Sequence, residues 1–532
     1  MDQAYAVEMS QAAVGRRVTA GQWTSRAQSS GAARVRPWYF LSTALAILLV
    51  AFVLRMWNLG GASLWTDEGL SALRAQSSLS ESFDSILSSG NQTPFYFMLL
   101  RLMPNTSEVL LRLPSVLFGM LGVALLMAVG LRLYHNYNLA LWAGALLAVN
   151  PYHILLSRTA RPYAFIFSLA LIIATVYLAL LRGSRSRMLW VVLTATSAVA
   201  YLTHYTLLAL PAAELLVFVV LWRRDLAFFK RWVVAQAIAC IPVLAWVVVL
   251  INHPVTVGPA WVPTPGLHDI PLTLWSMTIG YDGIRELYTL PAVLIISLGL
   301  CFGIYAAFEE MRQNPANLLW FWLITATLAV AFGISAFIVS FYVDRYFMMF
   351  LPGVLFLTVY GIRRAPRPVA NAALAVVAVT ALGNIVMAFH TGTFQRADYR
   401  GAAEFVAREY KPGDAVIIDR SNVEEVFMRY FEPGTKESPE LVLLSDTPDT
   451  TPYETTGRRV WVIYRNPNED IHEQGAMPDF DPLQQGLAPT GDWLYLRRDM
   501  IVRERMFNGV AVLELQMGER ILAGGIDVSL AQ

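Results

Sequence analysis

The chain has 532 residues, of which 56% are hydrophobic and only 15% are charged, and its mean hydropathy is +0.48. Soluble globular domains carry about 25% charged residues, so this composition excludes an ordinary soluble protein and indicates an integral membrane protein. The formal net charge of +1 gives no field that would attract nucleic acid. The two cysteines, Cys240 and Cys301, lie inside apolar runs and provide neither a disulfide framework nor a metal-ligand spacing.

A polar N-terminus precedes a series of long apolar runs. Residues 1–36 are rich in Ala, Ser and Gln and contain no apolar run, so we expect a disordered cytoplasmic tail rather than a signal peptide. Uncharged apolar runs of about 17–25 residues predict transmembrane helices, and we expect about eleven. These runs are Pro37–Leu54, Leu113–Leu131, Leu139–Ser157, Pro162–Leu181, Met188–Thr203, Tyr205–Trp222, Trp232–Ile251, Leu287–Phe308, Leu318–Val343, Tyr346–Ile362 and Pro368–Phe389.

The basic residues of the loops predict the orientation of these spans. Cytoplasmic loops of membrane proteins carry an excess of Lys and Arg. With the N-terminus in the cytoplasm, the basic clusters at residues 182–187, 223–231 and 363–367 all fall on the inner side. We therefore expect a multi-pass protein of the plasma (inner) membrane whose C-terminal part lies outside the cytoplasm.

This pattern divides the chain into three parts. We expect a tail over residues 1–36, a transmembrane domain over residues 37–390 and an extracytoplasmic domain over residues 391–532, with a long first outer loop over residues 55–112. In the last part charges return, and predicted helices alternate with short apolar strands and turns. The expected fold class is an α-helical polytopic membrane protein with a small C-terminal α/β domain.

An adjacent pair of carboxylates, Asp67 and Glu68, follows the first span in the run Leu-Trp-Thr-Asp-Glu-Gly. Carboxylates in a loop are ordinarily solvated and need no function. Other outer loops, however, bring further polar and aromatic groups to the same face of the membrane. These are residues 91–96, 150–153, 157–163, 204–205 and 344–346. Their convergence with the acidic pair predicts a functional site on the outer face.

The motifs of these loops resemble those of polytopic glycosyltransferases of the GT-C type, in the branch of protein O-mannosyltransferases and aminoarabinose transferases (family 39-like). The matching motifs are Trp-Thr-Asp-Glu at residues 65–68, Thr-Pro-Phe-Tyr-Phe at 93–97, Arg-Leu-Pro-Ser at 112–115, Asn-Pro through Arg-Pro-Tyr at 150–163, and Arg-Tyr at 345–346. The order and spacing of the motifs carry the resemblance, which covers about residues 38–390. It implies the GT-C fold, with about eleven transmembrane helices.

The resemblance also implies an activity. Such enzymes move a hexosyl or pentosyl sugar from a polyprenyl-phosphate donor to an acceptor protein, lipid or glycan, with inversion, on the outer face of the membrane. Asp67 would be the base that takes the acceptor proton, with Glu68 as the second choice or as an orienting partner. No cofactor is implied, and no nucleic acid. A divalent metal could be held by Asp67 or Glu68, but no cluster of ligands indicates one.

The lipid phosphate requires cations, and Arg is suited to it because its guanidinium forms charge-assisted, often bidentate bonds to phosphate oxygens. The expected donor phosphate-binding residues are Arg158, Arg161, Tyr163, Arg345 and Tyr346. Structural roles remain open for some of them. Arg158 and Arg161 could instead extend to lipid headgroups, and Arg345 could pair with the neighbouring Asp344 alone.

Two other functions remain as alternatives. A transporter or flippase of lipid-linked sugars would have internal repeats and several ionisable residues within the spans, whereas Glu214 alone lies in one here. A polysaccharide polymerase or ligase would carry a large outer loop in its C-terminal half, whereas the acid-bearing loop here is the first.

Overall fold

The computed structural model describes residues 37–90, 92–221, 225–253, 262, 264–280, 286–390, 396–418, 421–432, 440–443, 458–465, 493–494, 496–517 and 527–528. Residues from Ala44 onward form one compact unit, which contains the candidate site and the C-terminal part.

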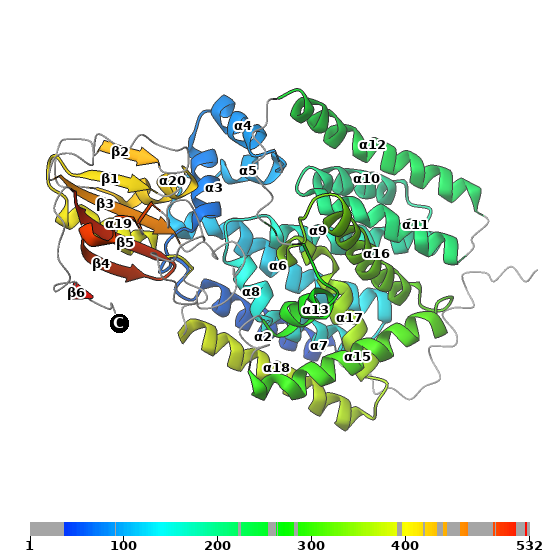
Figure 1. Ribbon diagram of the computed structural model, residues 1–532. Helices are drawn as coiled ribbons and strands as arrows, with labels where there is room; N and C mark the ends of the chain where they lie inside the picture. The colour runs from blue at the N-terminus through cyan, green and yellow to red at the C-terminus, as the bar shows by residue number, and fades with distance from the viewer. Residues whose placement is uncertain are drawn as a thin grey trace, which may run out of the picture. The chain divides into compact units, whose positions relative to one another are not determined.

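The long apolar runs form helices, as their length and composition predict (Figure 1). In chain order these are α2 (Pro37–Met56), α6 (Glu108–Tyr134), α7 (Tyr137–Ala148), α8 (Pro151–Ser157), α9 (Tyr163–Leu181), α10 (Arg187–Tyr201), α11 (Leu210–Val220), α12 (Leu226–Ile251), α15 (Leu290–Glu309), α16 (Pro315–Phe337), α17 (Leu351–Ile362) and α18 (Arg367–His390). Among the described residues, eight helical segments are long and apolar enough to cross a membrane, and α7 with α8 would make a ninth. The protein is therefore a multi-pass membrane protein.

The span count is lower than the expected eleven for two reasons. Helices α10 and α11 are apolar but shorter than a full span, and a break near residues 203–206 separates them. The third expected span, Leu139–Ser157, is bent by 62° between α7 and α8. The bend has a local cause, because Asn150 caps α8 by accepting a hydrogen bond from the His153 amide at 2.7 Å and Pro151 opens that helix.

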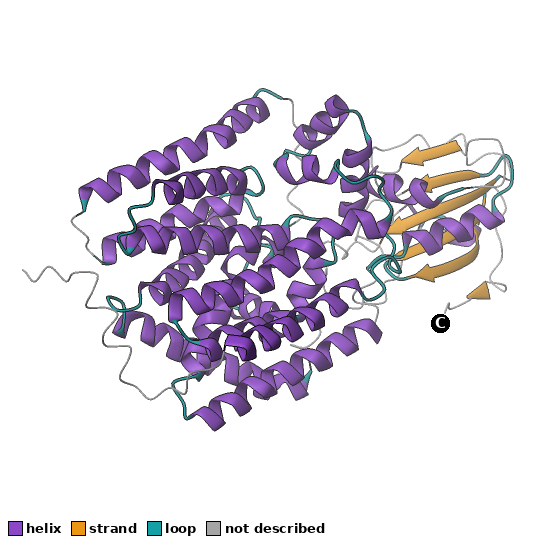
Figure 2. Cartoon of the chain, turned by 180° about the vertical axis from the view of Figure 1, so that it is seen from behind, coloured by secondary structure: helices purple, strands orange, loops and turns teal. Residues whose placement is uncertain are grey.

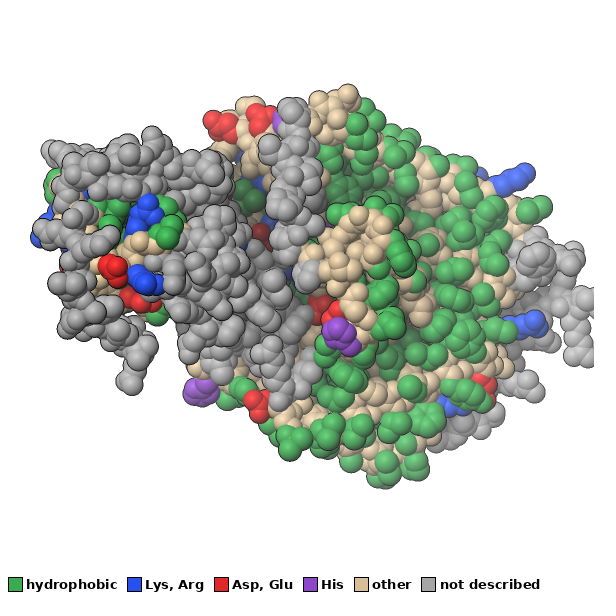
Figure 3. Space-filling model, in the orientation of Figure 1, with side chains coloured by type: hydrophobic (Ala, Val, Ile, Leu, Met, Phe, Trp, Pro, Cys, Tyr) green, Lys and Arg blue, Asp and Glu red, His purple; other side chains and the backbone are tan. Residues whose placement is uncertain are grey.

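Small residues allow the helices to pack closely. A Cβ atom on Gly361 of α17 would lie 1.9 Å from the carbonyl oxygen of Gly299 on α15, so this helix pair requires glycine. Close packing of this kind holds membrane helices together, because lipid is as apolar as the side chains it surrounds. Large apolar side chains such as Leu45, Ile241 and Val379 stay exposed, and hydrophobic side chains cover much of the helical region on the face drawn in Figure 3.

Shorter elements lie between the spans. They are α3 (Thr66–Gln76), α4 (Leu79–Ser88) and α5 (Phe95–Leu100) in the first loop, then the 3-10 helix η2 (Tyr205–Ala209), α13 (Asp269–Ile279), and the 3-10 helices η3 (Leu287–Thr289) and η4 (Asp344–Phe350). Helix α3 begins with the acidic pair. It has two acidic residues in its first turn and Arg74 in its last turn, the arrangement that complements a helix dipole.

The C-terminal part forms a sheet with helices, as Figure 2 shows in orange and purple. Its elements are α19 (Tyr399–Glu409), β1 (Ala415–Ile418), α20 (Ser421–Tyr430), β2 (Glu440–Leu443), β3 (Arg459–Arg465), the 3-10 helix η6 (Arg498–Met500), β4 (Ile501–Phe507), β5 (Val510–Gln516) and β6 (Asp527–Val528). In the described residues the strand order is β2-β1-β3-β5-β4-β6, with β1 parallel to both neighbours and β5 antiparallel to both of its own. A hairpin turn at Asn508-Gly509 joins β4 to β5.

The C-terminal part packs directly on the helix that carries the acidic pair. A Cβ atom on Gly69 of α3 would lie 2.0 Å from the Val426 side chain of α20, so α3 and α20 touch where Gly69 leaves room. Two hydrogen bonds continue this contact: the Leu64 amide donates to the Tyr430 hydroxyl at 3.0 Å, and Ser63 Oγ donates to the Ala397 carbonyl at 2.7 Å. The start of α3 is thus held by residues more than 300 positions away.

Candidate functional site

Asp67 lies in the first turn of α3 with its carboxylate partly open to solvent. Its side chain is 27% exposed, and Oδ2 lies 3.4 Å from Nη2 of Arg161. Burial by itself would raise the pKa of this carboxyl group, but the charges of Arg161, Arg345, Arg396 and Arg74 outweigh burial and lower the pKa below its usual value. Asp67 is therefore ionised at neutral pH, and it is surrounded by an excess of positive charge.

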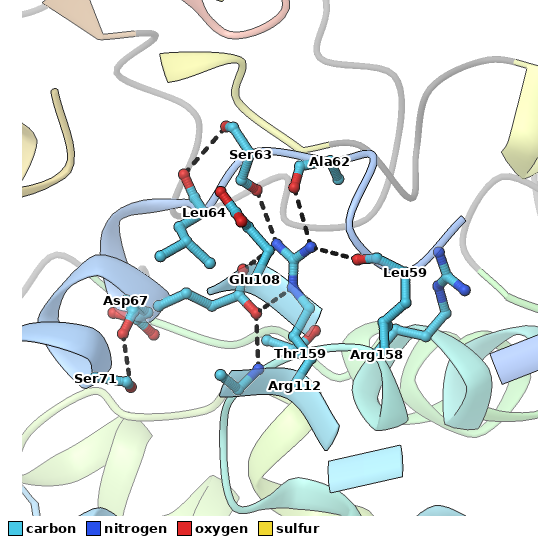
Figure 4. Close-up of polar contacts among 12 residues, drawn as sticks. Leu59, Ala62, Ser63, Leu64, Asp67, Ser71, Glu108, Arg112, Arg158 and Thr159 are labelled. Atoms are coloured by element: carbon cyan, nitrogen blue, oxygen red, sulfur yellow. Dashed lines mark hydrogen bonds and ion pairs between the residues drawn. The ribbon is translucent and has the colours of Figure 1, made fainter. Parts of the chain in front are cut away.

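Glu68, its neighbour in sequence, is buried and fully bonded. Arg112 donates to its two carboxylate oxygens through Nε at 2.9 Å and Nη2 at 2.6 Å, and the Ala160 amide donates to Oε1 at 2.7 Å. The Arg112 guanidinium also donates to the carbonyls of Leu59, Ala62 and Ser63, as Figure 4 shows. This pair connects α3, α6, the loop before α3 and the loop after α8.

Arg158 is also bound to backbone. Its Nη1 donates to the carbonyls of Arg55 at 2.9 Å and Trp57 at 2.6 Å, beside weaker contacts to Leu54 and Asn58. These carbonyls lie at the end of helix α2, where the last turn supplies no N–H donor for them. The side chain lies on the other side of Arg112 from Asp67 in the view of Figure 4. These contacts cap the end of α2, which is a structural role, and the phosphate contact expected of Arg158 from the sequence stays a prediction.

Arg161 faces Asp67 and is less completely bonded. Its Nη1 lies 3.5 Å from Oε1 of Gln92, the oxygen that also accepts from Arg74 at 2.9 Å. Within the described residues its Nε is buried without a hydrogen-bond partner. Hydrogen bonds fix the backbone of Arg161. Its carbonyl accepts a hydrogen bond from Ser115 Oγ at 3.0 Å, and Ser115 Oγ is in turn hydrogen-bonded to the Tyr96 hydroxyl at 2.6 Å. The motifs at residues 93–97 and 112–115 thus support the arginine that meets Asp67.

Arg345 approaches the same place from η4. Its Nε donates to the Tyr163 hydroxyl at 3.0 Å, and its guanidinium lies 5.2 Å from the ring of Tyr346 and 6.0 Å from the ring of Trp65. The neighbouring Asp344 accepts hydrogen bonds from Thr273 and Ser276 of α13, both at 2.9 Å. Arg345 therefore belongs to the group around Asp67, together with two tyrosines that the sequence had placed there.

The structure adds two arginines that sequence reasoning did not assign to the site. Arg74, about two turns after Asp67 on α3, is buried and donates to Ser85, Ser89 and Gln92. Arg396 lies between α18 and α19, and its guanidinium stacks on the Trp65 ring at 3.9 Å. The spacing along α3 could have indicated Arg74, whereas nothing in the sequence around Arg396 indicates a site.

Chemically, the arrangement offers one accessible carboxylate among guanidinium groups. The carboxylate can accept a proton, and the guanidinium groups can hold an anion. Of the described residues, no group of three His, Cys, Asp or Glu side chains lies close enough together to bind a metal ion.

Comparison with known proteins identifies the fold. No protein-family model and no curated protein sequence matches this chain. Among solved structures, the crystal structure of ArnT from Cupriavidus metallidurans in the apo state is similar, with a TM-score of 0.57 and 14% sequence identity over 90% of this chain and 97% of that one. The same protein bound to undecaprenyl phosphate gives a TM-score of 0.53, with the same identity and coverage. The apo oligosaccharyltransferase of Archaeoglobus fulgidus gives 0.47, with 11% identity over 82% and 70%.

Because the match to ArnT spans nearly the whole of both chains, it includes the membrane helices and the C-terminal part together. The chain therefore has the GT-C fold, as the resemblance of its loop motifs implied.

Proposed function

We propose that this chain is a membrane glycosyltransferase that moves a sugar from a polyprenyl-phosphate donor to an acceptor on a protein, lipid or glycan, with inversion at the anomeric carbon. The observation that carries the proposal is the position of Asp67: an ionised, partly open carboxylate with four arginines acting on it, in a chain with the GT-C fold. The similar ArnT structure bound to undecaprenyl phosphate supports the class of donor.

In the proposed reaction, an acceptor hydroxyl or amine attacks the anomeric carbon from the face opposite the phosphate. The new bond from the acceptor to the anomeric carbon forms, the bond from that carbon to the phosphate oxygen breaks, and the polyprenyl phosphate leaves with the electron pair. Asp67 takes the acceptor proton as the bond forms. Its lowered pKa keeps it in the ionised form that this role needs.

The guanidinium groups have the second role in this proposal. Negative charge grows on the phosphate as it leaves, and fixed cations in a partly dehydrated site stabilise that charge strongly. Arg161 and Arg345 are the residues best placed for it, with Tyr163 and Tyr346 beside Arg345. Glu68 takes no part in the chemistry here, because its carboxylate oxygens are already bonded to Arg112 and Ala160.

The proposal includes the orientation of the chain. The basic loops support a cytoplasmic tail over residues 1–36, a transmembrane domain over residues 37–390 and an extracytoplasmic domain over residues 391–532. The reaction would then take place on the outer face of the membrane.

The experiment is a transfer assay with the purified full-length protein and polyprenyl-phosphate sugars, in which mass spectrometry follows loss of donor and release of polyprenyl phosphate. Asp67→Asn keeps the size of the side chain and removes proton acceptance, so transfer should fall by roughly 10²–10⁴-fold, the range of a lost general base. Donor binding should persist. Asp84→Asn is the matched control, because Asp84 is an exposed carboxylate on α4 in the same loop, and it should retain wild-type turnover.

Two results would contradict the proposal. Wild-type protein that moves donor across a membrane without breaking the sugar–phosphate bond would be a transporter. Asp67→Asn protein with the same turnover as Asp84→Asn would remove Asp67 from the reaction.

A further inference from the structure

The arginines near Asp67 differ in how much of their hydrogen-bonding capacity the protein uses. Arg74, Arg112 and Arg158 each donate several hydrogen bonds to side chains and carbonyls. In contrast, no acceptor within the described part of the chain receives a hydrogen bond from the guanidinium of Arg396, and no carboxylate there lies within ion-pair distance of it. Its contact is the face of Trp65, at 3.9 Å. Stacking leaves the edge of a guanidinium, with its five donors, available to a ligand.

The backbone at this position is a second and independent observation. Arg396 has a φ of +49°, in the left-handed region that residues with a Cβ rarely adopt. Glycine would suit this backbone better. Donors from two distant segments hold this backbone. The Asn508 side-chain amide donates to the Arg396 carbonyl, and Ser63 Oγ donates to the next carbonyl, that of Ala397, at 2.7 Å. Unfavourable backbone of this kind tends to occur where the side chain is needed for function.

The charges around Arg396 place its side chain in the site. Asp67, Glu68, Arg345 and Tyr163 all act electrostatically on its guanidinium. Trp65, on which it stacks, is the residue just before α3 and lies 6.0 Å from the guanidinium of Arg345. The ring therefore connects two arginines that come from different parts of the chain, one from η4 and one from the segment after the last membrane helix.

We infer that Arg396, just before α19, is a binding residue for the phosphate of the lipid-linked donor and of the departing polyprenyl phosphate, and that it thereby completes the site. This inference rests on the proposed function. Its consequence is that the C-terminal part contributes directly to the site, because the hairpin residue Asn508 and the contact of α20 with α3 fix the backbone that presents Arg396.

The test measures binding of undecaprenyl phosphate to the full-length protein in lipid nanodiscs, together with thermal unfolding of the same samples. Arg396→Gly removes the side chain and relieves the left-handed backbone, while it also makes the unfolded chain more flexible, so thermal stability should change little. Binding should weaken by roughly 10- to 100-fold, the loss expected for hydrogen bonds to a charged group. Arg396→Lys keeps the charge but lacks the forked guanidinium, so its affinity for undecaprenyl phosphate should lie between those of the wild type and Arg396→Gly.

Arg408→Ala is the matched control, because Arg408 is exposed on α19 and, among the described residues, its side chain donates to the Glu404 carbonyl of its own helix; this variant should bind as the wild type does. Equal binding by wild type and both Arg396 variants would overturn the inference while leaving the proposed function intact. If Arg396→Gly does not fold, wild-type affinity in Arg396→Lys would equally overturn it. A wild-type protein that does not bind undecaprenyl phosphate would overturn the proposed function and this inference together.

Discussion

A substitution in the buried ion pair of Glu68 and Arg112 tests whether Glu68 stabilises the fold or takes part in the reaction. Glu68→Gln keeps the shape of the side chain but replaces one carboxylate oxygen by an amide that cannot accept a hydrogen bond. Three hydrogen bonds reach this carboxylate, at 2.9, 2.6 and 2.7 Å. The side chains of Glu68 and Arg112 are 1% and 5% exposed, so water cannot take the place of the lost carboxylate oxygen.

The expected cost follows from that burial. Removal of one partner from a buried ion pair leaves the other charge without compensation and typically costs about 3–5 kcal/mol. Arg112 keeps its bonds to the carbonyls of Leu59, Ala62 and Ser63, which offset part of the loss. We therefore expect Glu68→Gln to lower the free energy of unfolding by roughly 3 kcal/mol, near the low end of that range. Turnover per folded molecule should change far less than in Asp67→Asn.

The assay is a denaturant titration of the purified protein in mixed micelles, run beside turnover measurements on the folded fraction. Glu108→Gln is a matched control, because the pair of Glu108 with Arg400 is more exposed, at 18% and 29% of the side chains, and should contribute no more than about 1 kcal/mol. The double variant Glu68→Gln/Arg112→Gln should lose less than the sum of the single losses. Unchanged stability of Glu68→Gln, with turnover as low as that of Asp67→Asn, would instead assign Glu68 to the chemistry.

Four further outcomes are expected. Burial acts to raise the pKa of Asp67, and Arg161 is the largest of the charges that outweigh burial and lower it. Arg161→Gln should therefore raise the pKa of Asp67 and move the acid limb of the kcat/KM profile to higher pH. An acid limb that does not move would show that Arg161 does not act on the ionisation of Asp67. Arg345→Lys should weaken donor binding about tenfold through loss of the fork, whereas Arg158→Lys should lower the unfolding temperature and leave donor binding intact in the folded fraction. A reporter that is active only in the cytoplasm should be silent when fused after Gln532, and activity there would mean that the orientation is reversed.

The sequence was sufficient for the class of protein and for the approximate place of the site. Long uncharged runs must leave water whatever their neighbours are, so composition alone predicted a multi-pass helical protein. The acidic pair and the motifs around residues 158–163 and 345–346 were placed on the same face of the membrane, and the structure brings Asp67, Arg161, Tyr163 and Arg345 together.

The division of roles among these residues required the tertiary structure. Asp67 and Glu68 are adjacent and similar, yet a helix turns successive side chains about 100° apart, so that Glu68 meets Arg112 in the interior while Asp67 stays partly open. The sequence presents Arg158 as a candidate phosphate ligand, and only the fold shows that its guanidinium donates to the last carbonyls of α2, some 100 residues earlier in the chain. Arg396 shows the reverse case, since its place beside Trp65 depends on packing of the C-terminal part against α3. Local sequence determines which groups are present, but the acceptors that occupy each guanidinium come from distant segments, and only the folded chain decides which cations remain available to a ligand.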